Sequence, residues 1–309
     1  MKEKIRKCRI CGCVDGDCRQ CVEKTGHPCY WVEDDLCSAC KTTVVSFASI
    51  KGGTGKSSIV ICLANYLAIK GKRVLLIDSD LNNSLSLHYL NEDDGETIKK
   101  TKRLNIAAAL SNEANNLCDY AVPTIMPGID LIASTPYLAD LRALNEKRLK
   151  RMVSTIYGKY DILLIDCPPT YDNIVLNAVH AADYTITPVL QDLFSYNAAA
   201  FLSEVLPRDV EDLQNWFIMI NGYNKRFLEA KSGRQNNYLD LYRNAGFPMT
   251  PTETWFPWTS QIRFVVDYHK SLSATKGAKD SVFSPDLYKA VAELAGCFFD
   301  EELSASEVA

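Results

Sequence analysis

The chain has 309 residues, of which 47% are hydrophobic and 23% charged, so it can bury a sizeable core and contain one large domain with a small one. Its formal charge of −4 excludes a globally basic surface, so any contact with nucleic acid must come from a local patch. No apolar run approaches the roughly 18 residues of a membrane span, and we expect no membrane partner.

The first forty residues are rich in cysteine and contain eight of the twelve cysteines of the chain. These are Cys8, Cys11, Cys13, Cys18, Cys21, Cys29, Cys37 and Cys40. They include three C-x-x-C pairs, a spacing that lets one turn present two thiolates to the same metal ion. The sequence begins with charged residues and no apolar segment follows, so we expect no secretory signal and a reducing, cytoplasmic compartment.

Residues 1–41 are therefore predicted to form a module that metal ions hold together, because they include too few large apolar side chains for a core. Eight thiolates would satisfy two tetrahedral Zn²⁺ ions, and zinc is the leading interpretation. An iron–sulfur (Fe–S) cluster also takes four cysteines, so it stays open as the alternative. The spacing does not decide which cysteines share an ion.

Beyond Lys41 the composition changes to short apolar runs separated by longer helical patterns, which predicts a second domain over residues 42–309. The runs cover residues 42–49, 73–77, 129–133, 162–165, 184–189 and 216–220. Their apolar character is continuous and not alternating, which is typical of strands buried on both faces. The sequence thus predicts an α/β fold with a mostly parallel sheet flanked by helices.

Two helices have clear sequence patterns. Residues 57–70 place apolar side chains at helical spacing, and Gly71 follows as a cap. Near the end, Ser284-Pro285-Asp286 is typical of a helix start, and an apolar stripe follows at Leu287, Val291, Leu294, Ala295 and Phe298. Residues 91–103 and 230–237 are polar and are predicted to be loop-like insertions.

The first strand leads into Lys51-Gly52-Gly53-Thr54-Gly55-Lys56-Ser57-Ser58, which has the character of a phosphate-binding loop (P-loop). Glycines let backbone amides approach phosphate oxygens, and the following helix adds the positive end of its dipole. Lys56 would reach the β- and γ-phosphates of ATP, and Ser57 would bind Mg²⁺. Ser58 is placed to contact the α-phosphate.

Two further strands end in carboxylates. Asp78-Ser79-Asp80 ends the strand at residues 73–77, and Asp166 ends the strand at residues 162–165. The carboxyl edge of an open α/β sheet holds the ligand, so these residues and the phosphate loop are expected to converge on one nucleotide. Asp166 would hold Mg²⁺ through water, Asp78 is a further candidate for the magnesium site, and Asp78 or Asp80 would orient the attacking water.

With Lys51 as a second lysine in the loop, and Ile50 in place of the usual first glycine, the chain resembles the ParA/MinD family of deviant Walker A ATPases, and ParA-type partition ATPases most closely. The resemblance runs from Thr43 to about Ala295. It also rests on Asp78-x-Asp80, Asp166-Cys167-Pro168-Pro169, residues 182–189, Asn221 and Ile262-Arg263. Two segments depart from the family pattern: Leu81-Asn82-Asn83-Ser84 replaces a usual Pro-Gln-Gly, and residues 194–199 lack a usual glycine in a loop near the dimer contact.

The resemblance implies an ATP-dependent switch. In the family, the lysine matching Lys51 reaches across an ATP-bound homodimer to the partner's phosphates, the aspartate matching Asp80 positions the hydrolytic water, and the asparagine matching Asn221 contacts adenine. The dimer binds DNA non-specifically through late basic residues, among which Arg263 is the best match, and a ParB-like loading protein is the implied partner. Residues 225–280 carry nine Lys or Arg against five Asp or Glu.

The function implied is partitioning of plasmid, phage or chromosomal DNA at the nucleoid. A second function stays open, in which the cysteine module senses a metal or oxygen and the ATPase domain reports the result as a regulatory adaptor.

Overall fold

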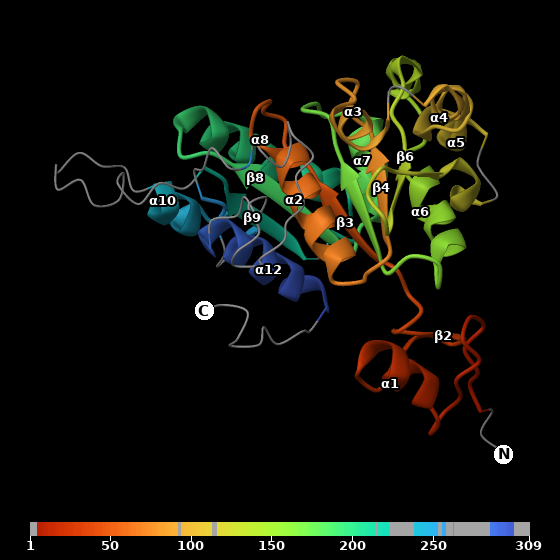
Figure 1. Cartoon of the computed structure of the whole chain (residues 1–309). Helices are drawn as coiled ribbons and strands as arrows, with labels where there is room; N and C mark the ends of the chain where they lie inside the picture. Colours follow the sequence, from red (N-terminus) through yellow and green to blue (C-terminus); the bar gives the residue numbers. More distant parts are fainter. Residues whose placement is uncertain are drawn as a thin grey trace.

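The computed structural model of the chain describes residues 5–91, 94–112, 116–213, 215–222, 238–252, 255–257, 262 and 285–299. Figure 1 shows a small part at the start of the chain and a larger α/β part built on one sheet. Arg263 and most of the basic residues between positions 225 and 280 lie outside the described residues, as do residues 230–237.

The sheet has eight strands in the order β10-β9-β8-β3-β7-β4-β6-β5. They are β3 (Thr43–Phe47), β4 (Val74–Asp78), β5 (Val122–Pro123), β6 (Ile129–Ile132), β7 (Ile162–Asp166), β8 (Tyr184–Val189), β9 (Trp216–Ile220) and β10 (Thr250–Pro251). Every neighbouring pair is parallel except β5 with β6. The predicted α/β class is confirmed, and each predicted strand has an observed counterpart. The two-residue edge strands β5 and β10 are too short to give a sequence pattern.

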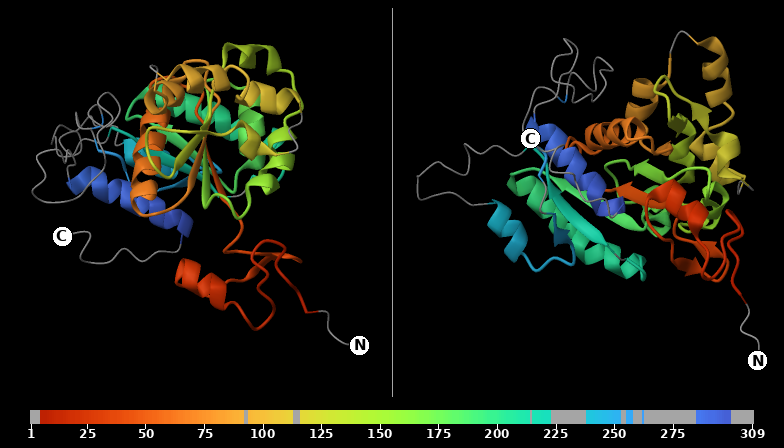
Figure 2. Two further views of the ribbon diagram at one scale, coloured as in Figure 1. Left: turned by 45° about the vertical axis from the view of Figure 1, so that its right-hand side comes forward. Right: turned by 60° about the horizontal axis from the view of Figure 1, so that its bottom comes forward.

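Helices cover both faces of the sheet (Figures 1 and 2). One face packs against α2 (Lys56–Ile69), α3 (Ser84–Tyr89) and α12 (Pro285–Phe299), and the other against α5 (Ile106–Ser111), α6 (Arg148–Met152), α7 (Asn173–Ala181) and α8 (Leu193–Asp209). Successive strand residues such as Val44 and Val45 enter opposite clusters, which explains why the strands are apolar without alternation. The other helices described in the larger part of the chain are α4 (Gly95–Thr101), α10 (Tyr238–Asn244) and the 3₁₀ turns η1 (Leu117–Tyr120), η2 (Pro136–Leu141) and η3 (Val153–Ile156).

No helix in the described part of the chain combines the length and apolar content that crossing a bilayer requires.

Two expectations about loops are wrong. Helix α4 lies inside residues 91–103, where Asp94 caps it by accepting from the Glu96 amide at 3.1 Å, and none of its residues is buried. A helix that buries none of its residues fully lacks an apolar stripe, so its sequence looks like a loop. Residues 194–199 belong to the start of α8, where the Asp192 side chain accepts from the Ser195 amide at 2.8 Å as the helix cap.

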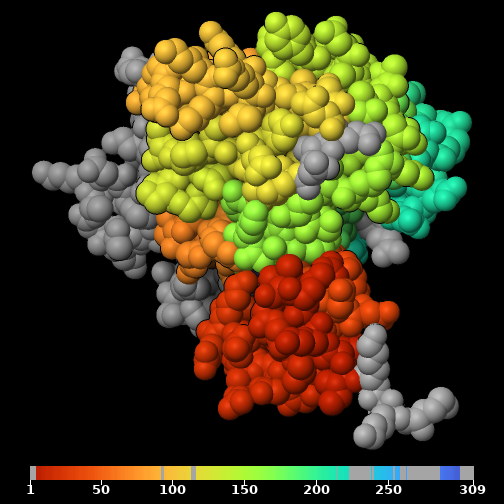
Figure 3. Space-filling view, turned by 90° about the vertical axis from the view of Figure 1, so that its right-hand side faces the viewer, coloured from red at the N-terminus to blue at the C-terminus, as the bar shows by residue number. Residues whose placement is uncertain are grey.

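The cysteine-rich part contains α1 (Arg19–Thr25) and an antiparallel pair, β1 (Trp31–Glu33) and β2 (Leu36–Cys37). The proposed domain boundary at Lys41 falls between β2 and β3. This part lies where the central strands begin: the Gly158 amide donates to the Cys40 carbonyl at 2.8 Å, and Lys24 Nζ lies 3.5 Å from the Asp161 carboxylate. Figure 3 shows it as a lobe against the segment before β7.

Candidate functional site

The phosphate loop and the two aspartate segments meet at the carboxyl edge of three adjacent strands, β3, β7 and β4. In the register, Asp166 lies beside Phe47 on one side and beside Asp78 on the other. The Ser79 amide donates to the Asp166 carbonyl at 3.0 Å, and the Cys167 amide donates to the Phe47 carbonyl at 3.2 Å. The structure therefore brings the residues expected around one nucleotide to one edge of the sheet.

The phosphate loop takes its shape from two glycines and one asparagine. Gly53 and Gly55 have φ angles of 75° and 86°, in the left-handed region that glycine adopts without strain. Asn221, which follows β9, donates from Nδ2 to the Thr54 carbonyl at 2.8 Å. A Cβ atom on Gly55 would lie 2.1 Å from Asn221 Nδ2, so only glycine permits this approach. Asn221 thus holds the loop, and the adenine contact expected of it stays a prediction.

Helix α2 begins at Lys56 without a side-chain cap, so its first amides remain available to an anion. The Lys56 side chain is 6% exposed, and Nζ lies 3.4 Å from the Ser49 carbonyl. Burial lowers the pKa of Lys56, and the negative charges of Asp166 and Asp80 oppose that shift. The only buried lysine among the described residues is therefore inside the loop that is expected to bind phosphate.

Asp166 is fully buried, and neither of its carboxylate oxygens has a hydrogen-bond partner among the described residues. Burial raises its pKa to about 8, and the nearby charge of Asp78 adds to the rise. A buried carboxylate without partners is costly, so such a group is generally kept for a ligand. Mg²⁺ prefers carboxylate, hydroxyl and water oxygens, and Asp166 with Ser57 in the first turn of α2 fits that preference.

Asp78 and Asp80 have different surroundings. Asp78 Oδ2 accepts from the Ser86 amide at 2.9 Å and the Ser86 hydroxyl at 2.8 Å, and Oδ1 accepts from the Asp80 amide at 3.2 Å. Burial raises the pKa of Asp78 to about 6. Its oxygens are thus used to order the turn after β4, whereas Asp80 is bound through one oxygen to the Asn82 amide at 2.9 Å. This difference favours Asp80 as the group that orients water, and Asp78 as a magnesium ligand stays a prediction.

Lys51 does not share the surroundings of Lys56. Its Nζ donates to both Asp192 oxygens, at 2.8 and 2.7 Å, and to the Ser195 hydroxyl at 3.0 Å. Burial alone would raise the pKa of Asp192, but the bonds from Lys51 and Ser195 hold it below the ordinary value. Asp192 and Ser195 were not predicted as site residues. Their D-x-x-S spacing is a helix-cap pattern and could have revealed the start of α8.

Asn83 takes the place of a residue that is usually glycine in the partition ATPases. Its φ angle is 55°, in the left-handed region, and it precedes α3. Its Oδ1 atom is buried without a hydrogen-bond partner in the described part of the chain. Asparagine is among the non-glycine residues that tolerate this region best, so the altered segment keeps a turn that normally requires glycine.

Six of the eight cysteines of the module form one compact group of thiols. Within each of two sets, Cys8, Cys11, Cys13 and Cys37, and Cys13, Cys21, Cys29 and Cys37, the sulfur atoms lie within 4.8 Å of one another. Cys18 and Cys40 belong to neither set. A metal ion fits these sulfurs, and its identity stays a proposal.

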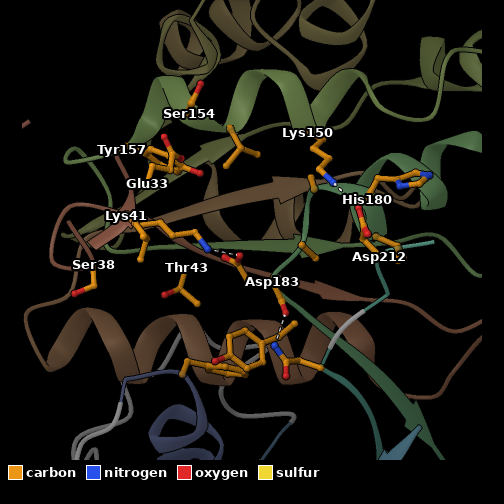
Figure 4. A pocket seen from close by; sticks show the side chains of 18 of the residues that line it. Glu33, Ser38, Lys41, Thr43, Lys150, Ser154, Tyr157, His180, Asp183 and Asp212 are labelled. Atoms are coloured by element: carbon orange, nitrogen blue, oxygen red, sulfur yellow. Dashed lines mark hydrogen bonds and ion pairs between the residues drawn. The ribbon is translucent and has the colours of Figure 1, made fainter. Parts of the chain in front are cut away.

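A cavity of about 860 Å³ lies between the cysteine module and the starts of the strands (Figure 4). Its charged side chains are all in ion pairs: Lys41 with Asp183, Lys150 with Asp212 at 3.8 Å, and Glu33 with Arg9 at 2.8 Å. These pairs leave no excess charge to select an ionic ligand. The cavity is at the opposite edge of the sheet from the phosphate loop, so it is separate from the nucleotide site.

Comparison with known proteins agrees with this geometry. A sequence profile of the family described as AAA domain matches residues 42–216. The chain is 32% identical over 194 residues to the cell division protein PomZ of Myxococcus xanthus, covering 60% of this chain and 59% of that protein. It is 33% identical over 180 residues to the chromosome partitioning protein ParA of Caulobacter vibrioides, covering 55% and 64%. The chain thus spans about three fifths of the length of these relatives.

Solved structures share the fold. A structure from Borrelia burgdorferi described as a plasmid partition protein bound to AMPPNP has a TM-score of 0.62 at 22% identity, covering 82% of this chain and 98% of that chain. A structure from Mycobacterium smegmatis described as cobyrinic acid a,c-diamide synthase, with a bound ATP analogue and magnesium, has a TM-score of 0.57 at 23% identity, covering 79% and 100%.

Proposed function

This chain belongs to the AAA domain family of P-loop ATPases, and from that premise we propose that it binds and hydrolyses Mg·ATP as a ParA-like partition switch. The observation that carries the proposal is that two buried ionisable side chains, Lys56 and Asp166, lie beside the glycine loop. Lys56 has a lowered pKa and Asp166 a raised one, because each is buried. A phosphate group with its magnesium ion would satisfy both.

In the proposed site the amides of the loop and of the start of α2 bind the phosphates, and Lys56 holds the β- and γ-phosphates. Asp166 and Ser57 would hold Mg²⁺, which neutralises charge that develops on the phosphate oxygens. Asp80, 7% exposed at the turn after β4, is proposed to orient the attacking water. Catalysis then depends on positioning and charge, because the protein forms no covalent bond to the phosphoryl group.

We propose ATP-dependent homodimerisation because of the surface beside Lys51. Leu193 and Phe194, next to Asp192, are 57% and 78% exposed, so two large apolar side chains lie beside the phosphate loop in the isolated chain. An exposed apolar pair at this edge fits a contact with a second copy of the chain. Lys51 would then reach the partner's phosphates.

Non-specific DNA binding, at the nucleoid and with a ParB-like partner, is proposed on the names of the relatives and on the excess of Lys and Arg between residues 225 and 280. Arg263 is the residue proposed for DNA. Binding through phosphate neutralisation would weaken steeply with salt, so mobility shifts at two salt concentrations, with Arg263→Glu as the variant, test this role.

For the cysteine module we propose zinc. Sulfur–sulfur distances of 3.6 to 3.8 Å join Cys37 to Cys11 and to Cys21, and join Cys13 to Cys29. They match the edge of about 3.8 Å of a tetrahedron with zinc–sulfur bonds of about 2.3 Å. In a [4Fe–4S] cluster each cysteine binds a different iron around a sulfide core, which holds the cysteine sulfur atoms farther apart. Iron with acid-labile sulfide in protein purified without oxygen would contradict this proposal.

The regulatory alternative has one observation in its favour. The module is bound to the chain segment directly before β7, the strand that ends in Asp166, through Gly158 and Asp161. A change in the module could therefore alter a strand of the nucleotide site. If ATP hydrolysis depends on the metal while DNA does not bind, the regulatory function is favoured over partitioning.

Three variants test the switch, each measured for ATP binding, dimerisation by light scattering, and hydrolysis. Lys56→Ala should abolish ATP binding because it removes the charge opposite the phosphates. Asp80→Ala should bind ATP and dimerise but not hydrolyse it. Lys51→Ala should bind ATP and remain monomeric, and an ATP-dependent dimer of this variant would exclude its role across the interface.

A further inference from the structure

Two independent four-thiolate zinc sites would keep their sulfur atoms in two separate groups. The structure shows a different arrangement, because the two candidate sets share Cys13 and Cys37 and together contain six cysteines instead of eight. The thiols therefore form one continuous group.

We infer that this group binds two zinc ions as a single binuclear cluster in which the Cys13 and Cys37 thiolates each bridge both ions. One ion would have Cys8 and Cys11 as its remaining ligands, and the other would have Cys21 and Cys29. Each ion then has four thiolates with only six cysteines, as tetrahedral zinc requires. The inference rests on the proposal that the module binds zinc.

The positions of the bridging residues fit this role. Cys13 is 7% exposed and Cys37 is fully buried, so both lie inside the module, where two ions can be reached from opposite sides. Cys13 lies 3.8 Å from Cys29, and Cys37 lies 3.6 Å from Cys11 and 3.8 Å from Cys21. Cys37 thus contacts a terminal ligand of each ion, as a bridging thiolate must.

Cys18 is the natural control. It directly precedes α1 and is only partly buried, and it belongs to neither set although it forms a C-x-x-C pair with Cys21. Two separate four-thiolate sites need all eight cysteines, whereas the bridged cluster does not use Cys18. The two arrangements therefore predict the same number of ions but different effects of Cys18→Ser.

The test uses the full chain reconstituted with the magnetic isotope of cadmium, which replaces zinc on thiolates. We expect two ions per chain and two cadmium NMR signals that split each other through the shared sulfurs. Cys18→Ser should keep both ions and the splitting, and Cys13→Ser should lose the splitting and at least one ion. If Cys13→Ser does not fold, the spectra of the natural chain and of Cys18→Ser decide the question.

Two unsplit signals, a single ion, or loss of an ion in Cys18→Ser would overturn the bridged cluster while leaving zinc binding intact. Iron and sulfide in place of zinc would remove the zinc proposal and this inference together, so the two failures can be distinguished.

Discussion

Lys51 and Asp192 form an ion pair within one chain, with Nζ at 2.8 and 2.7 Å from the two carboxylate oxygens. Lys51 is the residue proposed to meet the phosphates of a second chain, so the ion pair must open before that contact forms. Asp192 is also the cap of α8, which places the competing carboxylate next to the exposed Leu193 and Phe194. In the isolated chain Lys51 is thus held by an acidic side chain of its own chain.

Asp192→Asn should therefore dimerise at lower ATP concentration than the natural chain, because it removes the charge that retains Lys51. Asparagine caps helices as well as aspartate, so α8 should keep its start. A partly exposed ion pair contributes about 1 kcal/mol or less, and two such pairs open when a homodimer forms, so dimer affinity should increase by up to roughly thirtyfold. Light scattering across an ATP titration measures the effect.

The matched control is Asp172→Asn, since Asp172 caps α7 in the same way, accepting from the Ile174 amide at 3.0 Å, without contacting Lys51. If the ATP concentration needed for dimerisation falls equally in both variants, or does not fall in Asp192→Asn, the ion pair does not restrain dimerisation.

The buried Asp166 should make the stability of the nucleotide-free protein depend on pH. Its pKa is about 8 in the folded chain and near 3.8 when exposed, so the folded state holds one more proton between these values. The free energy of unfolding should then fall as pH rises through this window, by at most about 1.4 kcal/mol per pH unit. Asp166→Asn should flatten this dependence in denaturant unfolding, and equal slopes for the two proteins would contradict the prediction.

Two substitutions of Asn83 should have different effects on the free energy of unfolding. Asn83→Ala should lower the free energy of unfolding by about 1 kcal/mol, because alanine tolerates a left-handed backbone poorly. Asn83→Gly should be neutral or stabilising, because glycine adopts this conformation freely and removes the buried Oδ1 atom that lacks a partner. Denaturant unfolding measures both. Asn82→Ala is the control one residue away. If it lowers the free energy of unfolding as much as Asn83→Ala does, the loss does not come from the left-handed backbone angle of Asn83.

Removing metal should lower the unfolding temperature of the whole chain. The module has few large apolar side chains, so its fold should depend on the ions. Its loss would free the Gly158 amide from Cys40 and Asp161 from Lys24, at the starts of the central strands. Calorimetry with and without a chelator measures the shift. ATP binding in the chelated protein, measured alongside, would show whether the effect reaches the opposite edge of the sheet.

The sequence predicts those parts of the fold whose burial produces a regular spacing of apolar residues. The strands β3, β4 and β7 are buried on both faces, and α12 buries one stripe, so their apolar spacing is visible without a structure. Helix α4 buries none of its residues fully and carries no such pattern. The edge strand β5 is two residues long, which is below the length at which periodicity exists.

The same contrast holds for the site. Lys56, Asp80 and Asp166 follow strands in a recognisable order, so sequence alone could propose them. The partner of Lys51 could not be found this way, because Asp192 is 141 residues away and only the fold brings the two together. Likewise, the sharing of Cys13 and Cys37 by two sets of thiols depends on their three-dimensional positions and cannot be read from the intervals between cysteines in the sequence.

The cysteine module lies at the starts of the strands, and the phosphate loop lies at their other ends. A dimer that closes over the phosphate loops would therefore carry its two modules on opposite outer sides. Such a dimer would be bivalent. Its two cysteine modules could not both bind one small partner molecule, but they could link two partner molecules. The partner molecules that the modules recognise would then be brought together when ATP is bound and released when the dimer dissociates. The avidity would depend on the distance between the two modules.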